Sequence, residues 1–294
     1  MSDDNPLMQA ITPQEFLSRN YQNIVFAGGG NRCWWQAGVV EVLSLQPCWQ
    51  AQRLIGASAG AGIATAFATG RTKDSLAAAV ERFNATARNF EWRDLLKGQR
   101  PFMMPRIYPD WISSFLDESD LEKLKKVGLK IEVVITRPIP YLPLTLSTLL
   151  ALGLYASEKY WLKNFHARLP HHLGFRAEYL DLTQSAKLAD ARTLLMASAA
   201  AVPITPIHRV GGRAALDGGF YDSIPLPQDR QGDPETLVLL TRHRADLPQM
   251  FTHQQRVYLQ PAQKVAAINM DCTSGTNVQL TYDQGRIEAL ALIG

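Results

Sequence analysis

Two short apolar runs near the start of the chain each stop at a glycine, and a helix-like segment follows each run. Such runs bounded by glycine are typical of buried strands. The expected elements, in chain order, are a strand over 23–27, a helix over 33–45, a strand over 53–55, a helix over 59–69 and a strand over 130–136. Two strand–helix units in succession predict an α/β fold with a mainly parallel central sheet flanked by helices.

The rest of the chain also contains both strand-like and helix-like segments, and the irregular stretches between them are longer. Further helices are expected over 72–83 and 184–200, and further strands over 172–182 and 235–241. Aromatic and methionine side chains lie among prolines and charges in 90–116, which indicates an inserted segment with its own apolar surface. Ser119 and Glu122 have the spacing of a capping box for a short helix that ends near Gly128.

No stretch has the composition of a linker or an internal repeat, so we expect a single domain over 1–294 with insertions near 90–128 and 138–170. The composition is 46% hydrophobic and 19% charged, which excludes a disordered or coiled-coil protein. The net charge of +3 is too small to indicate a nucleic-acid-binding protein, so no nucleic-acid partner is expected.

The 3 cysteines, Cys33, Cys48 and Cys272, form no CxxC pair and leave an odd count. A disulfide framework is therefore not expected, and a reducing compartment fits best. The first residues lack a basic stretch followed by an apolar run, so we expect no Sec-type leader. We predict a cytoplasmic protein with peripheral membrane contact, and secretion routes that need no such leader stay open.

The segment Gly56-Ala57-Ser58-Ala59-Gly60 joins an expected strand to an expected helix. A serine at such a sharp turn sits on strained backbone with its hydroxyl exposed, and its neighbours must be small to avoid the strand and the helix. The N-terminus of the following helix also stabilises developing negative charge. This context favours a nucleophilic serine over a plain glycine-rich turn.

The segment Gly28-Gly29-Gly30-Asn31-Arg32 is a second glycine-rich junction between a strand and a helix. Consecutive glycines leave backbone N–H groups free to face a cavity, as in an anion nest or an oxyanion hole. A dinucleotide-binding fingerprint would need glycine where Cys33 stands, and an acidic residue about 20 positions later, which is absent. No GxxxxGK[ST] phosphate loop occurs either, so no nucleotide cofactor is expected.

The third motif, Asp217-Gly218-Gly219, follows the extended segment 207–216. Glycines after an aspartate let the carboxylate side of the turn approach another loop closely. Alone, the motif indicates a turn and nothing more.

In their order and spacing, the three motifs together resemble the patatin-like phospholipase family. That family combines a glycine-rich oxyanion loop followed by Arg or Lys, a GxSxG elbow, and an Asp-Gly-Gly or Asp-Gly-Ala motif. The stretch Ala197-Ser198-Ala199-Ala200, followed by a proline, is similar to the family's small-residue helix end. The resemblance covers a motif-bearing core of about 23–227. It departs at Cys33, where the family usually has glycine, and Trp34 and Trp35 add bulk beside the loop.

The resemblance implies a patatin-like three-layer architecture and a serine lipid acyl hydrolase of the phospholipase A or lysophospholipase type, without cofactor or metal. It implies a dyad in which Ser58 is the nucleophile, Asp217 is the base, and an acyl-enzyme intermediate forms. The other implied site residues are Gly28, Gly29 and Gly30 in the oxyanion hole, Gly56 and Gly60 in the elbow, and Arg32, Gly218 and Gly219 in the loops. Arg32 either steadies its loop or meets a lipid phosphate. The alternative is a weakly active or inactive lipid-binding or regulatory protein on the same scaffold, which Cys33 and the two tryptophans favour.

A histidine base, as in an α/β-hydrolase triad, is the rival arrangement. His243 and His253 are the only histidines after Asp217, and neither stands in a tight glycine-flanked loop. A free aspartate has a pKa near ~3.9, so a dyad requires direct contact with the serine and burial that raises that pKa. The 6 histidines show no metal-ligand spacing, so no metal site is expected.

Residues 138–157 carry no charge, and aromatic and basic side chains flank them. Such a stretch suits the interface of a bilayer. Prolines shorten its helical part to about 14 residues, below the ~20 needed to span. A buried helix or lid and an interfacial anchor both stay open, and the aromatic segment 101–116 is a second candidate anchor. The flanking side chains are Tyr141, Tyr155, Lys159, Tyr160, Trp161, Lys163, Arg168 and Arg176. The expected partners are a phospholipid or another lipid ester and a membrane surface.

Overall fold

A mixed sheet forms the centre of the protein. The computed structural model describes residues 8–157, 165–167, 169–227, 233 and 235–294. Within these residues the sheet has 10 strands in the order β1-β9-β10-β8-β2-β3-β4-β7-β6, with β5 paired to β4. The strands are β1 (Gln9–Ala10), β2 (Tyr21–Phe26), β3 (Trp49–Ala57), β4 (Lys130–Arg137), β5 (Arg176–Asp181), β6 (His208–Val210), β7 (Arg213–Asp217), β8 (Thr236–Leu239), β9 (Met250–His253) and β10 (Arg256–Leu259). The five central strands β10, β8, β2, β3 and β4 run parallel, and antiparallel strands close both edges.

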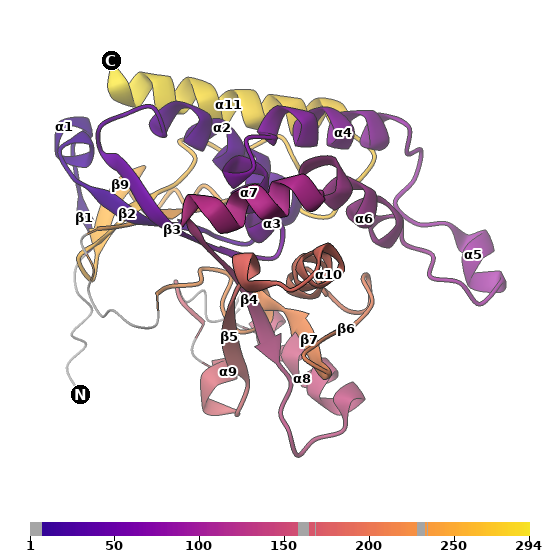
Figure 1. Ribbon diagram of the computed structural model, residues 1–294. Coiled ribbons are helices and arrows are strands. Elements are labelled where there is room, and N and C mark those ends of the chain that lie inside the picture. Colours follow the sequence, from indigo (N-terminus) through magenta and orange to yellow (C-terminus); the bar gives the residue numbers. More distant parts are fainter. Residues whose placement is uncertain (1–7, 158–164, 168, 228–232, 234) are drawn as a thin grey trace.

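Helices cover both faces of this sheet, which confirms the predicted α/β architecture. In Figure 1, α2, α4 and α11 lie along the upper face, and α8 and α9 lie on the opposite side. The helices are α1 (Pro13–Leu17), α2 (Trp34–Leu43), α3 (Ala59–Ala68), α4 (Thr72–Asn84), α5 (Trp92–Leu96), α6 (Met104–Phe115), α7 (Glu118–Val127), α8 (Leu144–Ser157), α9 (Leu169–His172), α10 (Leu188–Ser198) and α11 (Gly275–Ile293). Short 3-10 turns are η1 (Gly30–Cys33), η3 (Leu182–Gln184) and η4 (Gly218–Phe220).

The central strand β2 shows why an uninterrupted apolar run becomes a strand here. Ile24, Val25 and Phe26 are all fully buried. Successive side chains of a strand point to opposite faces, so both faces of this strand must be covered. Ile24 and Phe26 belong to the larger apolar cluster, and Val25 belongs to a second cluster with Ala57 and Val238.

Two sequence-based expectations need correction. The extended segment 207–216 is a hairpin, because Gly211 and Gly212 both take positive φ and turn the chain between β6 and β7. The helix that ends at Gly128 is capped by Asp117, whose side chain accepts from the N–H of Asp120, and not by Ser119.

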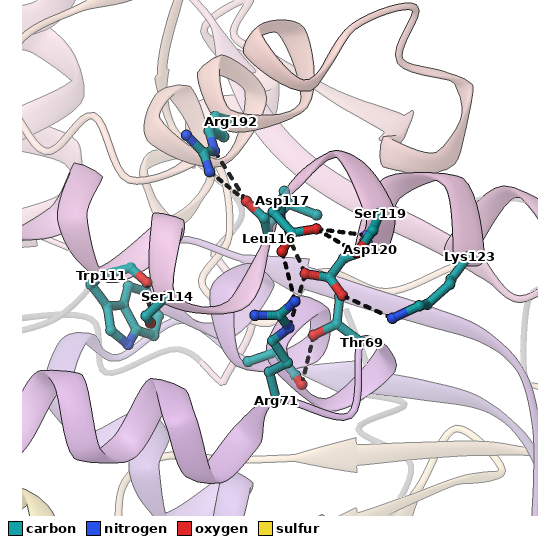
Figure 2. A network of polar contacts seen from close by, with 11 residues as sticks. Thr69, Arg71, Trp111, Ser114, Leu116, Asp117, Ser119, Asp120, Lys123 and Arg192 are labelled. Atoms are coloured by element: carbon teal, nitrogen blue, oxygen red, sulfur yellow. Dashed lines mark hydrogen bonds and ion pairs between the residues drawn. The ribbon is translucent and has the colours of Figure 1, made fainter.

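The cap of α7 is part of a polar network that joins three parts of the chain (Figure 2). Arg71, at the start of α4, bonds to Asp117 at 2.6 Å and to Asp120 at 3.0 Å. Arg192 of α10 donates to the carbonyl of Leu116 at 2.7 Å. Asp120 is 1% exposed, so its pairing with Arg71 compensates a buried charge. The network therefore fixes how α4, α7 and α10 pack.

The aromatic segment 90–116 divides into two parts. In α6, Trp111, Ile112 and Phe115 are buried in the larger cluster, so most of its apolar surface is core. The short α5 projects from the body in Figure 1, and its Trp92 is 70% exposed. The segment is thus only in part the separate apolar surface that its composition predicts.

Candidate active site

Ser58 stands at the junction between β3 and α3. The strand ends at Ala57, the helix begins at Ala59, and Ser58 between them has φ 54° and ψ −135°. Few residues other than glycine adopt such a backbone conformation, which marks the turn as strained. A Cβ on Gly56 would overlap backbone atoms of α3, and a Cβ on Gly60 would overlap the end of β2. The small residues thus allow the tight turn that leaves Ser58 partly exposed.

Asp217 lies beside this serine although 159 residues separate them in sequence. In the sheet, β4 lies between β3 and β7, and Asp217 ends β7 opposite Ile135 of β4. Ser58 Oγ donates a hydrogen bond of 2.8 Å to Asp217 Oδ2. The N–H of Gly219 donates to the other carboxylate oxygen, Oδ1, at 2.7 Å. The structure therefore brings the predicted nucleophile and base into direct contact.

Burial makes Asp217 a stronger base than an ordinary aspartate. Its side chain is almost completely enclosed, and desolvation raises the pKa of its carboxyl from 3.8 to about 6. The hydrogen bonds from Gly219 and Ser58 oppose this rise, because they stabilise the ionised form. At neutral pH the carboxylate is still mostly ionised and is ready to accept a proton.

Two buried hydroxyl groups hold the pair in place. The N–H of Ser58 donates to Ser198 Oγ at 2.9 Å, and Ser198 Oγ donates to the carbonyl of Val134 at 2.6 Å. Thr136 Oγ1 donates to the carbonyl of Asp217 at 2.8 Å. The sequence pointed to Ser198 only as part of a small-residue helix end, and Thr136 stood inside an expected strand without any signal.

The glycine loop runs beside the elbow, since a side chain at Gly28 would touch the Cβ of Ser58. The N–H of Gly28 donates to the carbonyl of Ser223 at 2.7 Å, so it is occupied and not available to an oxyanion. The N–H of Gly29 faces the buried thiol of Cys33, to which it donates a hydrogen bond. In the described part of the chain, the N–H of Gly30 has no hydrogen-bond partner. Gly30 has φ 55°, which favours glycine at this position. Of the three predicted donors, Gly30 is therefore the free one among the described contacts.

Segments far along the chain support this loop, and no sequence motif predicts them. The N–H of Asn31 donates to the carbonyl of Asn269 at 2.9 Å, and its side-chain amide donates to the carbonyl of Asp271. Thr241 Oγ1 donates to the carbonyl of Gly28 at 3.2 Å. All three supporting residues lie beyond the core of 23–227.

Cys33, Trp34 and Trp35 are at most 3% exposed and face the core. Desolvation raises the pKa of the Cys33 thiol to about 12, so the thiol is protonated and unreactive at neutral pH. Trp34 packs edge-on against Trp111 with ring centres 5.9 Å apart, and Trp35 Nε1 donates to Glu288 at 2.9 Å. The bulk that follows the glycine loop is thus core packing.

Within the described residues, no histidine is bonded to Ser58. His243 Nδ1 lies 3.0 Å from the carbonyl of Pro261, and His253 is buried against Phe165 and Tyr258. In the same residues, no three side chains of His, Cys, Asp or Glu lie together as a metal would require.

Residues next to the pair line two cavities. Gly28 and Gly219 line a pocket of about 450 Å³. Gly30 and Ala59 line a narrow apolar cavity of about 40 Å³, which Trp111 also lines. The wide pocket therefore adjoins the glycine loop and the Asp217 turn through Gly28 and Gly219, while Ser58 and Asp217 are not among the residues that line it.

Helix α8 exposes one apolar face. Ser147, Ala151 and Leu154 of this helix are buried, whereas Leu146 and Leu149 are 50% and 65% exposed. Along the parts of the chain that the structure describes, no helix is both long and apolar enough to cross a membrane. Of the aromatic and basic residues expected to flank α8, five lie outside the described residues: Lys159, Tyr160, Trp161, Lys163 and Arg168.

A comparison with known proteins identifies the family of the segment that carries this site. No curated protein matches the chain. A family model described as patatin-like phospholipase matches residues 24–229, which include the glycine loop, Ser58 and Asp217. That match covers more than half of the sequence and agrees with the core of 23–227 over which the motifs resemble this family. The chain therefore belongs to the patatin-like phospholipase family of lipid acyl hydrolases.

Proposed function

We propose that the protein is a phospholipase A or lysophospholipase in which Ser58 is the nucleophile and Asp217 is the base. The observation that carries this proposal is the hydrogen bond of 2.8 Å between Ser58 Oγ and Asp217 Oδ2 on a strained elbow. A nucleophile and its base within hydrogen-bond reach are what covalent catalysis requires. The carboxyl pKa of about 6 supports the role of Asp217 as base.

The reaction proceeds through an acyl-enzyme. Asp217 takes the proton of Ser58 as Oγ attacks the carbonyl carbon of the ester, and the free N–H of Gly30 stabilises the oxyanion. The protonated Asp217 then gives its proton to the leaving alcohol as the C–O bond breaks. A water molecule, deprotonated by Asp217, attacks the acyl group and releases the fatty acid and Ser58.

Helix α8 supports action at a membrane surface. Its exposed Leu146 and Leu149 lie on the helix that also carries Tyr155, and Tyr155 lines the wide pocket beside the pair. An apolar helix face of this kind adsorbs to the boundary between headgroups and acyl chains. The protein thus binds the lipid surface with the entrance to its site facing the bilayer.

Lipid product analysis tests the hydrolase. Wild-type protein incubated with mixed phospholipid vesicles is expected to release fatty acid, and a fluorophosphonate probe is expected to label Ser58. Ser58→Ala and Asp217→Asn should each lower hydrolysis by several powers of ten while the protein stays folded. Absence of any product, with no probe labelling, would favour the alternative of a lipid-binding protein with little chemistry. Retention of activity in Asp217→Asn, with loss in His243→Ala, would replace the proposed dyad with a triad.

A further inference from the structure

The narrow apolar cavity begins beside the proposed nucleophile. Two residues next to the reacting groups line it: Gly30, whose N–H is free among the described contacts, and Ala59, which directly follows Ser58. Ser58 itself is not among the lining residues. An ester carbonyl that contacts both Ser58 Oγ and the N–H of Gly30 therefore lies at the mouth of this cavity, and one of its two substituents has the cavity next to it.

The two cavities beside the site differ in the chemistry of their walls. Charged side chains, among them Asp222 and Arg242, line the wide pocket of about 450 Å³. Mostly apolar side chains, among them Ile63 and Phe83, line the narrow cavity of about 40 Å³. An acyl chain is apolar, whereas the alcohol part of a phospholipid is polar and bulky. The narrow cavity therefore suits the acyl group, and the wide pocket suits the alcohol that leaves.

The size of the narrow cavity limits the acyl group that it can hold. One water-sized group needs about 10–15 Å³ of this kind of volume, so a cavity of about 40 Å³ holds about three such groups. With the carbonyl carbon at the mouth, an acyl group of about four carbon atoms fills the space.

Two aromatic rings of α6 close the cavity one helical turn beyond Ala59. A side chain on Gly62 of α3 would overlap the ring of Trp111 and would lie 3.6 Å from the hydroxyl of Tyr108. The rings of Tyr108 and Trp111 have centres 5.2 Å apart, and Trp34 packs edge-on against Trp111. Both rings are at most 9% exposed. Because extra atoms forced into a packed core are costly, a longer chain meets a wall that yields little.

We propose that the narrow cavity receives the acyl group of the substrate and that Trp111 and Tyr108 limit its length, so that the enzyme prefers lipid esters with acyl groups of about four carbon atoms. This inference rests on the proposed function, because it assigns the acyl specificity of the same site. Longer acyl groups must displace Trp111 from Gly62, and kcat/KM is therefore expected to fall as the chain grows.

A series of nitrophenyl esters that differ only in the acyl chain tests this limit: acetate, butyrate, hexanoate and octanoate. Wild-type kcat/KM should be highest for butyrate and about tenfold lower for octanoate. Without a closed cavity, each added methylene would instead bury more apolar surface and raise kcat/KM. A steady rise up to octanoate in wild type would thus overturn the proposal.

Two variants change the cavity in opposite directions. Trp111→Leu opens the wall and should raise the ratio of kcat/KM for octanoate over butyrate about tenfold. Ala79→Val adds atoms to another wall of the cavity and should lower the ratio for butyrate over acetate about tenfold. Each ratio compares two substrates on the same folded molecules, so partial loss of folding does not alter it. Should Trp111→Leu fail to fold, Ala79→Val still decides.

The matched control is Phe16→Leu. It removes a fully buried ring of α1 that lines neither cavity, so the protein should be less stable but should keep the wild-type ratios. Leu240→Ala widens the other pocket and should also keep them. Ratios that change in Leu240→Ala but not in Trp111→Leu would place the acyl chain in the wide pocket and overturn the proposal.

The two proposals fail in different ways. Wild-type protein that hydrolyses none of the esters, or a Ser58→Ala protein that hydrolyses them all, overturns the proposed function. Hydrolysis that depends on Ser58 but has the same ratios in wild type, Trp111→Leu and Ala79→Val overturns only the acyl site.

Discussion

Replacing Asp217 with asparagine should remove activity and stabilise the folded protein at neutral pH. The buried carboxyl has a pKa of about 6 in the folded chain, against an ordinary value of 3.8. Below pH 3.8 the Asp217 carboxyl is protonated in both the folded and the unfolded state, so its contribution to the free energy of unfolding is fully present. As pH rises toward 6 and above, the carboxyl ionises first in the unfolded chain. This ionisation stabilises the unfolded state, so the contribution of Asp217 to stability is lost.

The size of the effect follows from the difference between the two pKa values. It corresponds to about 3 kcal/mol of lost folding free energy once pH is well above 6. Asparagine has no charge to desolvate and keeps an oxygen that accepts from the N–H of Gly219. It leaves Ser58 Oγ without its carboxylate partner, which offsets the gain by about 1 kcal/mol. A net gain of about 1–3 kcal/mol is therefore expected at pH 8.

Urea unfolding at pH 8 and pH 4.5 measures this difference. The stability gained by Asp217→Asn should be large at pH 8 and should shrink at pH 4.5, because acid removes the charge from the wild-type carboxyl. The exposed Asp110 gives the control, since Asp110→Asn should change stability by less than about 0.5 kcal/mol at either pH. In parallel, wild-type kcat/KM should rise with pH and level off above pH 6. A variant no more stable than wild type at pH 8, or activity that is constant down to pH 4.5, would refute the reasoning.

Three further changes probe the support of the site, the buried thiol and the membrane face. Ser198→Ala leaves the N–H of Ser58 without its hydrogen-bond acceptor, so kcat should fall about tenfold or more with little change in KM. Ser198→Thr keeps a hydroxyl and should recover part of the lost kcat. Steady-state kinetics measures both effects. Cys33 should resist alkylation in the native protein and react only after unfolding, as mass spectrometry will detect; fast native labelling with loss of activity would place the thiol at the site. Leu146→Ser with Leu149→Ser should weaken vesicle binding in a flotation assay but leave hydrolysis of a short soluble ester intact. Ile287→Ser, an exposed residue of α11, which lies across the sheet from α8 in Figure 1, should change neither.

The sequence predicts those parts of the site that a short stretch of the chain determines by itself. A serine between glycines at a strand–helix junction has few conformations available, so Ser58 and its turn follow from five residues. Asp217-Gly218-Gly219 is weaker alone, and the family resemblance supplied its pairing with Ser58. Ser198 and Thr136 act through single hydrogen bonds across the sheet, and no local pattern encodes such contacts.

The C-terminal part of the fold escaped prediction for a related reason. Helix α11 packs on α2 and α4 (Figure 1), yet its apolar positions show little helical periodicity. Part of this contact is made by glycine, since a side chain on Gly38 would overlap the carbonyl of Tyr282 and one on Gly285 would overlap Trp35. A helix pair that meets through backbone has few apolar side chains to mark it in the sequence.

The misassigned cap of α7 shows how tertiary contacts choose between local options. The chain offers two overlapping capping boxes, Asp117 with Asp120 and Ser119 with Glu122. Only the first places both carboxylates on Arg71, at 2.6 Å and 3.0 Å, as Figure 2 shows. Arg71, which is distant in sequence, therefore determines which residue caps α7, and the sequence around the helix does not.

The same close packing suits Asp217 to the role of base that we propose for it. A side chain on Gly218 would overlap the carbonyl of Val134 and crowd Ala57, so this glycine lets the Asp217 turn close against β3 and β4. Exclusion of water from that contact is what raises the carboxyl pKa to about 6. A carboxylate more exposed to water would keep its hydrogen bond to Ser58, but its pKa would fall toward 3.8 and it would be a weaker base. The glycines of the motif thus tune the chemistry of Asp217 as well as its position, and the resulting instability of the ionised form is the physical cost of the proposed dyad without histidine.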